Sequence, residues 1–243
     1  MTPLARNLLV SLIGGTLLWI SVFSSSYLNY VKPSFRFFLI AAGLCLLVVG
    51  VVGLVRSWST DTADGGHHGG EGNCCDGDEH GGGGSRVAWL LVLPVLAIFL
   101  VAPPALGSFA AEREPTPPAP AAWEADDYLP LVDDGNPVPM PVSEFVRRAW
   151  LNKSLSGWDV ELTGFVVPRK KGGWYLTRMQ MNCCAADARA WKVVVKNVKR
   201  PPVDTWVTVV GSWVVLGADE RPDAPELTVR DMERIPAPEE PYE

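Results

Sequence analysis

Apolar residues are concentrated in three uncharged runs in the first half of the chain. No charged residue occurs between Arg6 and Lys32. The same holds between Arg36 and Arg56 and across residues 87–111. Each run reaches the roughly 17–25 residues that a helix needs to cross a bilayer. We therefore predict a membrane region over residues 1–111, with three transmembrane helices at residues 8–27, 37–55 and 87–106.

The alternative for the first run is a cleaved signal peptide. The run is too long for one, and it has no persuasive small-x-small cleavage site. Three spans would place the amino terminus and the second loop on one side of the bilayer, and the first loop and the carboxy-terminal region on the other. Lysines and arginines are almost equally divided between the two sides, so the positive-inside rule decides little. We expect a multi-pass protein of the cell membrane, with the second loop cytoplasmic and the carboxy-terminal domain extracytoplasmic.

After the third run the pattern changes to one typical of a small soluble domain. Prolines are dense after Glu112, which favours an extended polyproline linker over residues 112–141. A short helix is predicted from Ser143, capped by that residue. Its apolar stripe consists of Phe145, Val146, Ala149 and Trp150.

From Trp158 onward, apolar and polar residues alternate, which indicates strands. Glycines at 172 and 173 predict a tight hairpin turn. Further strands are predicted at residues 174–182, 190–195, 205–215 and 226–232. Five short strands and the glycines at 164 and 211 favour an all-β, OB-like small barrel over residues 142–243. A sandwich with a similar number of strands is the alternative.

The net charge of the chain says little about its partners. The net charge is −6, which gives no electrostatic reason to expect a nucleic acid partner. Lysines, arginines and tryptophans in the predicted barrel would fit an oligonucleotide surface. At strand positions, however, such charges more often form a solvated face, and tryptophans more often belong to the core. We expect the lipid bilayer and no nucleic acid.

The loop over residues 61–85 is rich in glycine and in metal-ligand residues. All three histidines of the protein lie in it. Imidazole and thiolate are ligands that zinc, copper and nickel favour. The spacing is not that of a structural zinc site, so we predict weak metal contact, with a solvated linker as the alternative. The candidate ligands are His67, His68, Cys74, Cys75 and His80.

A second candidate site is the cysteine pair of the predicted barrel. Cys183 and Cys184 would point to opposite faces of a regular strand. They could bind one metal ion only if the strand ends there, and residues 185–187 could supply that break. Two thiolates with the Asp187 carboxylate form a reasonable zinc set. In the alternative, one cysteine belongs to the core and Asp187 forms a turn.

Catalysis has little support in the sequence. The predicted barrel contains no histidine that could act as a base for a cysteine nucleophile. Arg178 and Arg189 alone are weak grounds for a lowered thiol pKa. The sequence has no Ser/His/Asp set, no phosphate-binding glycine loop and no paired catalytic carboxylates, so we do not expect an enzyme.

A family resemblance rests on two motifs. The first reads Arg178-x4-Cys183-Cys184-x-Ala186-Asp187, and the second is the Pro-x-x-Pro-Tyr ending at Tyr242. Together with the ligand-rich loop, they resemble the YcgQ-like family of membrane proteins that accompany a YcgR-type multi-span permease. The resemblance implies an accessory permease subunit linked to transition-metal handling. It also implies that the first cysteine position accepts histidine or cysteine, which favours the metal interpretation of the pair.

These arguments lead to one hypothesis and two alternatives. The hypothesis is an accessory subunit of a permease that binds or presents a transition metal such as zinc near the pore mouth. The first alternative is a purely structural interaction subunit whose cysteines belong to the core. The second is an extracytoplasmic thiol-redox protein.

Overall fold

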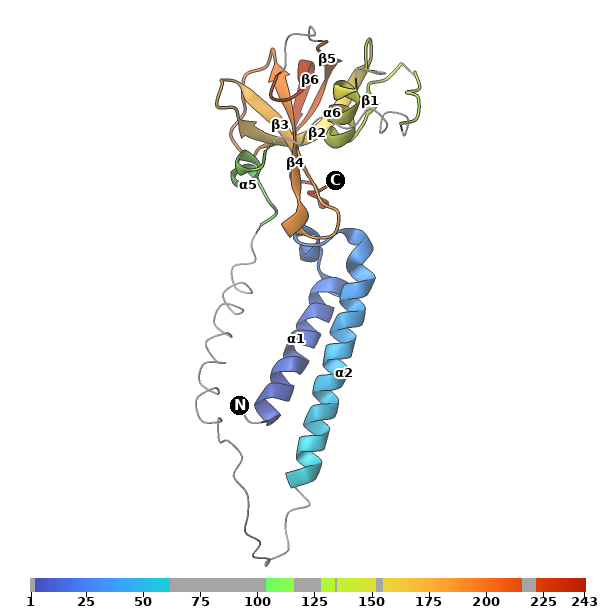
Figure 1. The fold of residues 1–243 in the computed structure, drawn as a ribbon, viewed down its shortest axis with the longest axis vertical. Coiled ribbons are helices and arrows are strands. Elements are labelled where there is room, and N and C mark those ends of the chain that lie inside the picture. The colour runs from blue at the N-terminus through green and yellow to red at the C-terminus, as the bar shows by residue number, and fades with distance from the viewer. Residues whose placement is uncertain (1–2, 62–103, 116–127, 134, 152–154, 216–221) are drawn as a thin grey trace, which may run out of the picture. The chain divides into compact units, whose positions relative to one another are not determined.

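The chain forms two compact units. The computed structural model describes residues 3–61, 104–115, 128–133, 135–151, 155–215 and 222–243. One unit comprises Met1–Tyr27 and Pro33–Pro104, and the other comprises Leu28–Lys32 and Ala105–Glu243 (Figure 1). The second unit therefore begins well before the predicted boundary at residue 142, and it includes a segment that lies between the first two helices in sequence.

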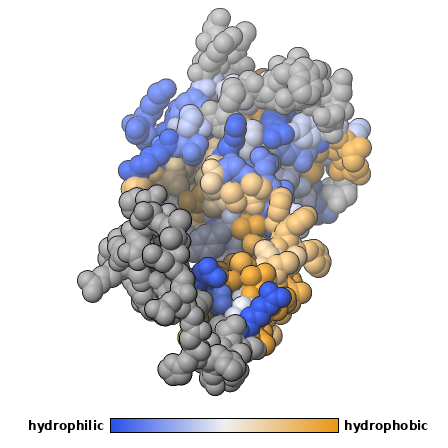
Figure 2. All heavy atoms as spheres, turned by 60° about the horizontal axis from the view of Figure 1, so that its bottom comes forward, coloured by the Kyte–Doolittle hydropathy of each residue, from blue (hydrophilic) through white to orange (hydrophobic). Residues whose placement is uncertain are grey.

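The first unit contains two long helices, α1 (Pro3–Phe23) and α2 (Arg36–Asp61). Within them and the turn before α2, the segments Leu4–Phe23 and Pro33–Arg56 are long and apolar enough to cross a membrane, by length and composition. This agrees with the first two predicted spans. Few of their residues are buried, 11% of the most apolar stretch in each, and Figure 2 shows apolar side chains at the surface of the molecule. The two helices are compatible with membrane anchoring.

Small residues bring α1 and α2 together. A Cβ atom added at Gly14 of α1 would lie 2.6 Å from the Leu47 amide nitrogen and 2.8 Å from the Gly43 carbonyl oxygen of α2. Gly50 approaches Ser11 in the same way. Such close backbone approach through small residues is typical of packed membrane helices. Arg36 closes the end of α1, because its guanidinium donates to the carbonyl oxygens of Ser21 (2.9 Å) and Val22 (3.3 Å).

Two sequence predictions fall on residues that the structure does not describe. The loop with its candidate ligands His67, His68, Cys74, Cys75 and His80 lies there, and so does the third predicted span up to residue 103. The last residue of that span, Leu106, belongs to the second unit. Its amide donates to the Tyr242 hydroxyl (3.0 Å), and its side chain packs on the sheet. The predicted end of the span at residue 106 is therefore wrong.

The second unit is built on a mixed sheet of six strands. Five strands correspond to the predicted ones within two residues. The strand β1, only two residues long, was not predicted. The strands are β1 (Val138–Pro139), β2 (Asp159–Pro168), β3 (Trp174–Gln180), β4 (Arg189–Lys196), β5 (Trp206–Trp213) and β6 (Glu226–Arg234).

The five longer strands form a closed cycle of pairings. The order is β1-β2-β3-β4-β6-β5, and β2 also pairs with β5. The β4–β6 pair is parallel, and the other pairs in the cycle are antiparallel. A shift in register at Val210/Gly211 interrupts the β5–β6 pair. A Cβ atom at Gly211 would lie 2.2 Å from the Thr228 carbonyl oxygen, so this bend requires glycine.

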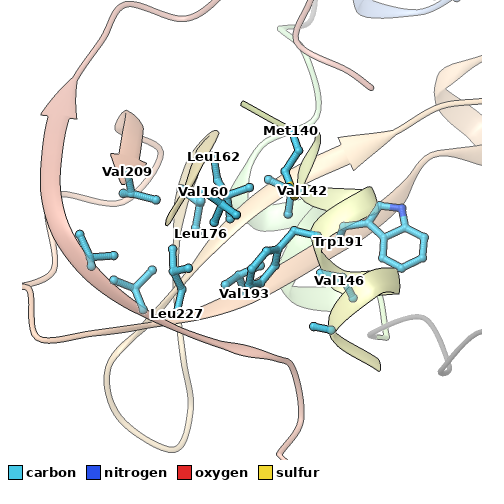
Figure 3. Packing of buried hydrophobic residues seen from close by; sticks show 14 of the residues in the cluster. Met140, Val142, Val146, Val160, Leu162, Leu176, Trp191, Val193, Val209 and Leu227 are labelled. Carbon is cyan, nitrogen blue, oxygen red and sulfur yellow. The ribbon is translucent and has the colours of Figure 1, made fainter. Parts of the chain in front are cut away.

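One main apolar core lies between the strands and the helix α6 (Val142–Trp150). Figure 3 shows Val142 and Val146 of α6 beside Trp191, Val193 and Leu176 of the sheet. Alternation along β2 produces this arrangement, because Val160 and Leu162 point inward and their polar neighbours are more exposed. The turn between β2 and β3 has positive φ at both Gly172 and Gly173, as the glycine pair predicted.

The helix α6 begins differently from the prediction. It starts at Val142, after Pro141, and Ser143 does not cap it. Its first amides, those of Val142 and Ser143, instead donate to the Glu243 carboxylate at 2.7 and 3.0 Å. A carboxylate at this position satisfies amides that have no partner within the helix, and it interacts favourably with the helix dipole. The cap is therefore distant in sequence, which local patterns cannot reveal.

A second, smaller apolar cluster lies on the other face of the sheet. It contains Phe165, Val167, Met179 and Ala190, and Ala111 of the short helix α5 (Ser108–Arg113) covers it. Asp204 holds the start of α5, since its carboxylate accepts bonds from the Ser108 amide and hydroxyl. The first residues of the predicted 112–141 linker thus belong to the folded domain.

Candidate metal centre

The cysteine pair lies in a turn between two strands. The strand β3 ends at Gln180, and β4 begins at Arg189. Between them, Ala185–Asp187 form the 3-10 turn η4. We call residues 182–187 the Cys turn. Because it is not regular β structure, the two cysteines need not point to opposite faces.

The three candidate ligands of the Cys turn lie together. The two thiol sulfurs and a carboxylate oxygen of Asp187 all lie within 4.8 Å of one another. Cys183 is exposed, and Cys184 and Asp187 are partly exposed. Neither cysteine belongs to the apolar clusters of the described domain. Both sulfurs are therefore placed where a small ion could reach them.

Backbone amides hold the Asp187 carboxylate in place. One oxygen accepts a hydrogen bond from the Asn182 amide at 2.9 Å. The other accepts bonds from the amides of Cys183 at 2.9 Å and Cys184 at 3.4 Å. This is the turn-forming role that Asp often has. A carboxylate has about four lone-pair sites, so these bonds orient Asp187 and leave acceptor capacity.

The carboxylate also sets the ionisation of the neighbouring thiol. Hydrogen bonding to Asp187 is the main cause that raises the pKa of the Cys183 thiol from 9.0 to about 11. The same contact, with the amides of Asn182 and Cys183, lowers the pKa of Asp187 to about 2. At neutral pH the turn therefore holds a thiol that donates to a carboxylate. A bound cation would take the place of that proton.

This chemistry suits a metal ligand better than a nucleophile. Reactive cysteines have a lowered pKa in positive surroundings, whereas Cys183 has a raised one beside a carboxylate. Two sulfurs and one oxygen, with access from solvent, match a zinc site that keeps an open position. The donor set on the Cys turn therefore fits zinc or another thiophilic cation.

The segment Leu28–Lys32 pairs with the Cys turn inside the second unit. Val31 forms an antiparallel bridge with Cys184. The Lys32 amide donates to the Cys183 carbonyl oxygen (3.1 Å), and the Ala185 amide donates to the Tyr30 carbonyl oxygen (2.8 Å). The turn is thus bound to a segment that continues in sequence into α2.

The carboxy-terminal residues run beside the end of β3. Tyr242 forms a parallel bridge with Met179. The Glu243 amide donates to the Met179 carbonyl oxygen (2.9 Å), and the Met181 amide donates to the main-chain oxygen of Glu243 (3.0 Å). Arg178 donates to the Glu240 carbonyl oxygen (2.7 Å) and lies over the Trp206 ring. Arg178, which belongs to the sequence motif, therefore contacts this tail.

Sequence reasoning missed these supporting residues. The Pro-Tyr ending is a sequence motif, but nothing local indicates that Tyr242 pairs with Met179 and bonds to Asn29. Residues 28–32 were placed in a loop, and β pairing across 150 positions leaves no periodic signal. Ala186 is exposed in the middle of η4, and no contact explains its place in the motif.

Comparison with known proteins supports only part of the resemblance. Residues 151–243 match the family model described as the DUF1980 C-terminal domain, a name that denotes unknown function. The matched segment includes the strands β2–β6, the Cys turn and the tail. No curated protein and no solved structure matches the chain. Membership of the YcgQ-like family stays a prediction.

Proposed function

We propose that this protein is an accessory subunit of a membrane permease and that its Cys turn binds and presents a transition metal such as zinc. The observation that carries the proposal is the grouping of Cys183, Cys184 and Asp187, with all ligand atoms within 4.8 Å and the sulfurs outside the core. Three ligands and an open position favour exchange with a partner over permanent storage.

The fold supports a presenting role. The closed cycle of five strands, with a parallel β4–β6 pair, has the connectivity expected of the OB-like barrel that we propose. Its pairings fix the ends of β3 and β4 and thereby the Cys turn between them. A site on rigid elements keeps its geometry while one side remains open.

The proposed membrane topology follows from the pairing of residues 28–32 with the Cys turn. If α1 and α2 both cross the bilayer, the segment between them lies on one side, and the domain that it pairs with lies on that same side. The route from the end of α2 to Ala105 then has to return across the bilayer. The third span expected from sequence, outside the described residues except at its end, would supply that return. We propose that this side is extracytoplasmic.

The partnership with a permease is supported by the exposed apolar side chains of α1 and α2. Such surfaces are covered by lipid or by other membrane helices. The resemblance to permease-associated proteins points to a multi-span partner. In this proposal the loop ligands His67, His68, Cys74, Cys75 and His80 would receive or sense the metal on the other side of the bilayer.

Zinc titration of the full-length chain in detergent tests the metal proposal. A chromophoric chelator would compete for zinc, first with the wild type and then with the double variant Cys183→Ser, Cys184→Ser. Cys45→Ser is the matched control, because Cys45 is also a free, exposed cysteine but belongs to α2.

We expect the double variant to lose one zinc-binding class that the Cys45→Ser variant keeps. A third variant, in which the loop ligands are replaced by serine and alanine, separates binding at the loop from binding at the turn. Equal stoichiometry and affinity in the wild type and the double variant would overturn the proposal and leave a structural interaction subunit as the better description.

A further inference from the structure

We propose that the carboxy-terminal tail and residues 29–32 act as a clamp that presets the Cys turn for metal binding, with Tyr242 as its main positioning residue. This inference rests on the proposed function. It adds that the metal affinity of this site depends on residues that do not touch the metal.

The first arm of the clamp binds the Cys turn directly. Its two hydrogen bonds run from the Lys32 amide to Cys183 and from the Ala185 amide to Tyr30. Cys184 lies between these two bonds, opposite Val31, and Cys183 provides the carbonyl oxygen of the first bond. The main-chain conformation at Cys183 and Cys184 therefore depends on a segment about 150 residues earlier in the chain.

The second arm fixes the strand that leads into the turn. Glu243 pairs with Met179 and Met181 through main-chain hydrogen bonds of 2.9 and 3.0 Å. Met181 lies two residues before Cys183, beyond the end of β3. Without the tail, the chain between Gln180 and Cys183 would have no pairing partner on this side. The Glu243 carboxylate also binds the start of α6, which anchors the tail to the domain core.

Tyr242 joins the two arms. Its hydroxyl donates to the Asn29 carbonyl oxygen (2.9 Å) and accepts from the Leu106 amide (3.0 Å). Its ring packs on the second apolar cluster beside Met179 and Ala188. One side chain thus connects the tail, the first arm and the start of the domain. Groups that orient metal ligands from outside the coordination sphere typically change affinity by about 10–100-fold when removed.

The test compares two Tyr→Phe variants of the full-length chain in detergent. Tyr242→Phe removes the hydroxyl that joins the arms and keeps the ring. Tyr175→Phe is the matched control, because Tyr175 packs on the same cluster and its hydroxyl donates to Asp223 away from the clamp. Each variant is titrated with zinc and with Co²⁺, whose visible absorption reports thiolate coordination and geometry. Thermal unfolding without metal measures the structural cost.

We expect Tyr242→Phe to weaken zinc binding at the turn by about tenfold and to alter the Co²⁺ spectrum. Tyr175→Phe should keep the zinc affinity and the Co²⁺ spectrum of the wild type, even if its thermal midpoint falls by as much as that of Tyr242→Phe. If both variants bind zinc like the wild type, or both weaken equally, Tyr242 is structural only and the inference fails. If the wild type itself binds no zinc at the turn, the proposed function fails first.

A second pair of variants covers the first arm and does not depend on Tyr242. Lys32→Pro removes the amide that donates to Cys183, whereas Lys32→Ala keeps it. We expect the proline variant alone to weaken zinc binding and to speed amide exchange at Cys183 and Cys184 in the metal-free protein. Equal affinity and equal exchange in the two variants would contradict the clamp.

Discussion

The two units of this protein use apolar residues in opposite ways. In the strand-rich domain, apolar side chains such as Val160, Leu162 and Leu176 are fully buried, and their polar neighbours along β2 are more exposed. In the helix pair, large apolar side chains face outward, and Phe37 is 78% exposed. The closest contacts between α1 and α2 form at glycines, where the two backbones approach each other. The strand-rich domain has the burial pattern of a protein folded in water, and the helix pair has an exposed apolar surface that is compatible with membrane anchoring.

The comparison predicts opposite costs for shortening an apolar side chain. Phe145→Ala in α6 removes a side chain that is 0% exposed and should cost about 3–5 kcal/mol of unfolding free energy. Leu12→Ala in α1 removes one that is 62% exposed and should leave the fold of the detergent-solubilised chain almost unchanged. Denaturant titration with hydrogen exchange assigns each loss to its unit. A large loss for Leu12→Ala would show that this face is buried in protein.

Enlarging a small residue, in contrast to shortening an apolar one, should destabilise the helix pair. A Cβ atom at Gly14 would lie 2.6 Å from the backbone of α2, whereas one at Gly15 would meet only the Leu47 side chain at 3.7 Å. Gly14→Ala should therefore destabilise the pair by about 1–3 kcal/mol. Gly15→Ala should be neutral or slightly stabilising, because alanine favours helix. Amide exchange in α1 measures the difference, and equal effects of the two substitutions would disprove the close contact.

The smallest expected effect on stability belongs to Asp187→Asn, which keeps one acceptor oxygen in the Cys turn and acts mainly on thiol reactivity. Asp187→Asn removes the carboxylate that raises the pKa of Cys183, so that pKa should fall toward its ordinary value of 9.0. Near pH 8 the thiolate fraction should rise by about tenfold for each pKa unit lost. Alkylation by a water-soluble maleimide, followed by mass spectrometry, should therefore be faster at Cys183. Cys45 of α2 serves as the negative control, because in membranes we expect a water-soluble maleimide not to label it. An unchanged Cys183 rate would mean that Asp187 does not control this thiol.

Much of the domain was predictable because its strands obey local rules. The alternation of apolar and polar residues predicted the ends of β2 to β6 within two residues. The pair of glycines predicted the turn at Gly172 and Gly173. The grouping of Cys183, Cys184 and Asp187 was expected only on the condition that the strand ends near them, with a core cysteine and a turn-forming Asp187 as the alternative. The structure meets that condition, because β3 ends at Gln180 and η4 (Ala185–Asp187) follows before β4.

The supporting residues were not predictable, because their partners are distant in sequence. The cap of α6 was assigned to Ser143, the obvious local residue, but Glu243 fills it from about 100 positions away. The folded domain was placed after residue 142, but α5 and the segment Leu28–Lys32 pack on it. Neither contact produces a period or a turn signal, so only the folded chain reveals them.

The order of residues alone determined which parts of this protein are apolar helices, where the strands lie and which side chains can bind a metal, because these follow from hydropathy, periodicity and side-chain chemistry. The tertiary structure decided that the strand pairings close on themselves, that residues 28–32 pair with the Cys turn and that Tyr242 bonds to Asn29 and Leu106. Those facts depend on contacts between segments far apart in the chain, whose free energy appears only when the whole domain has folded.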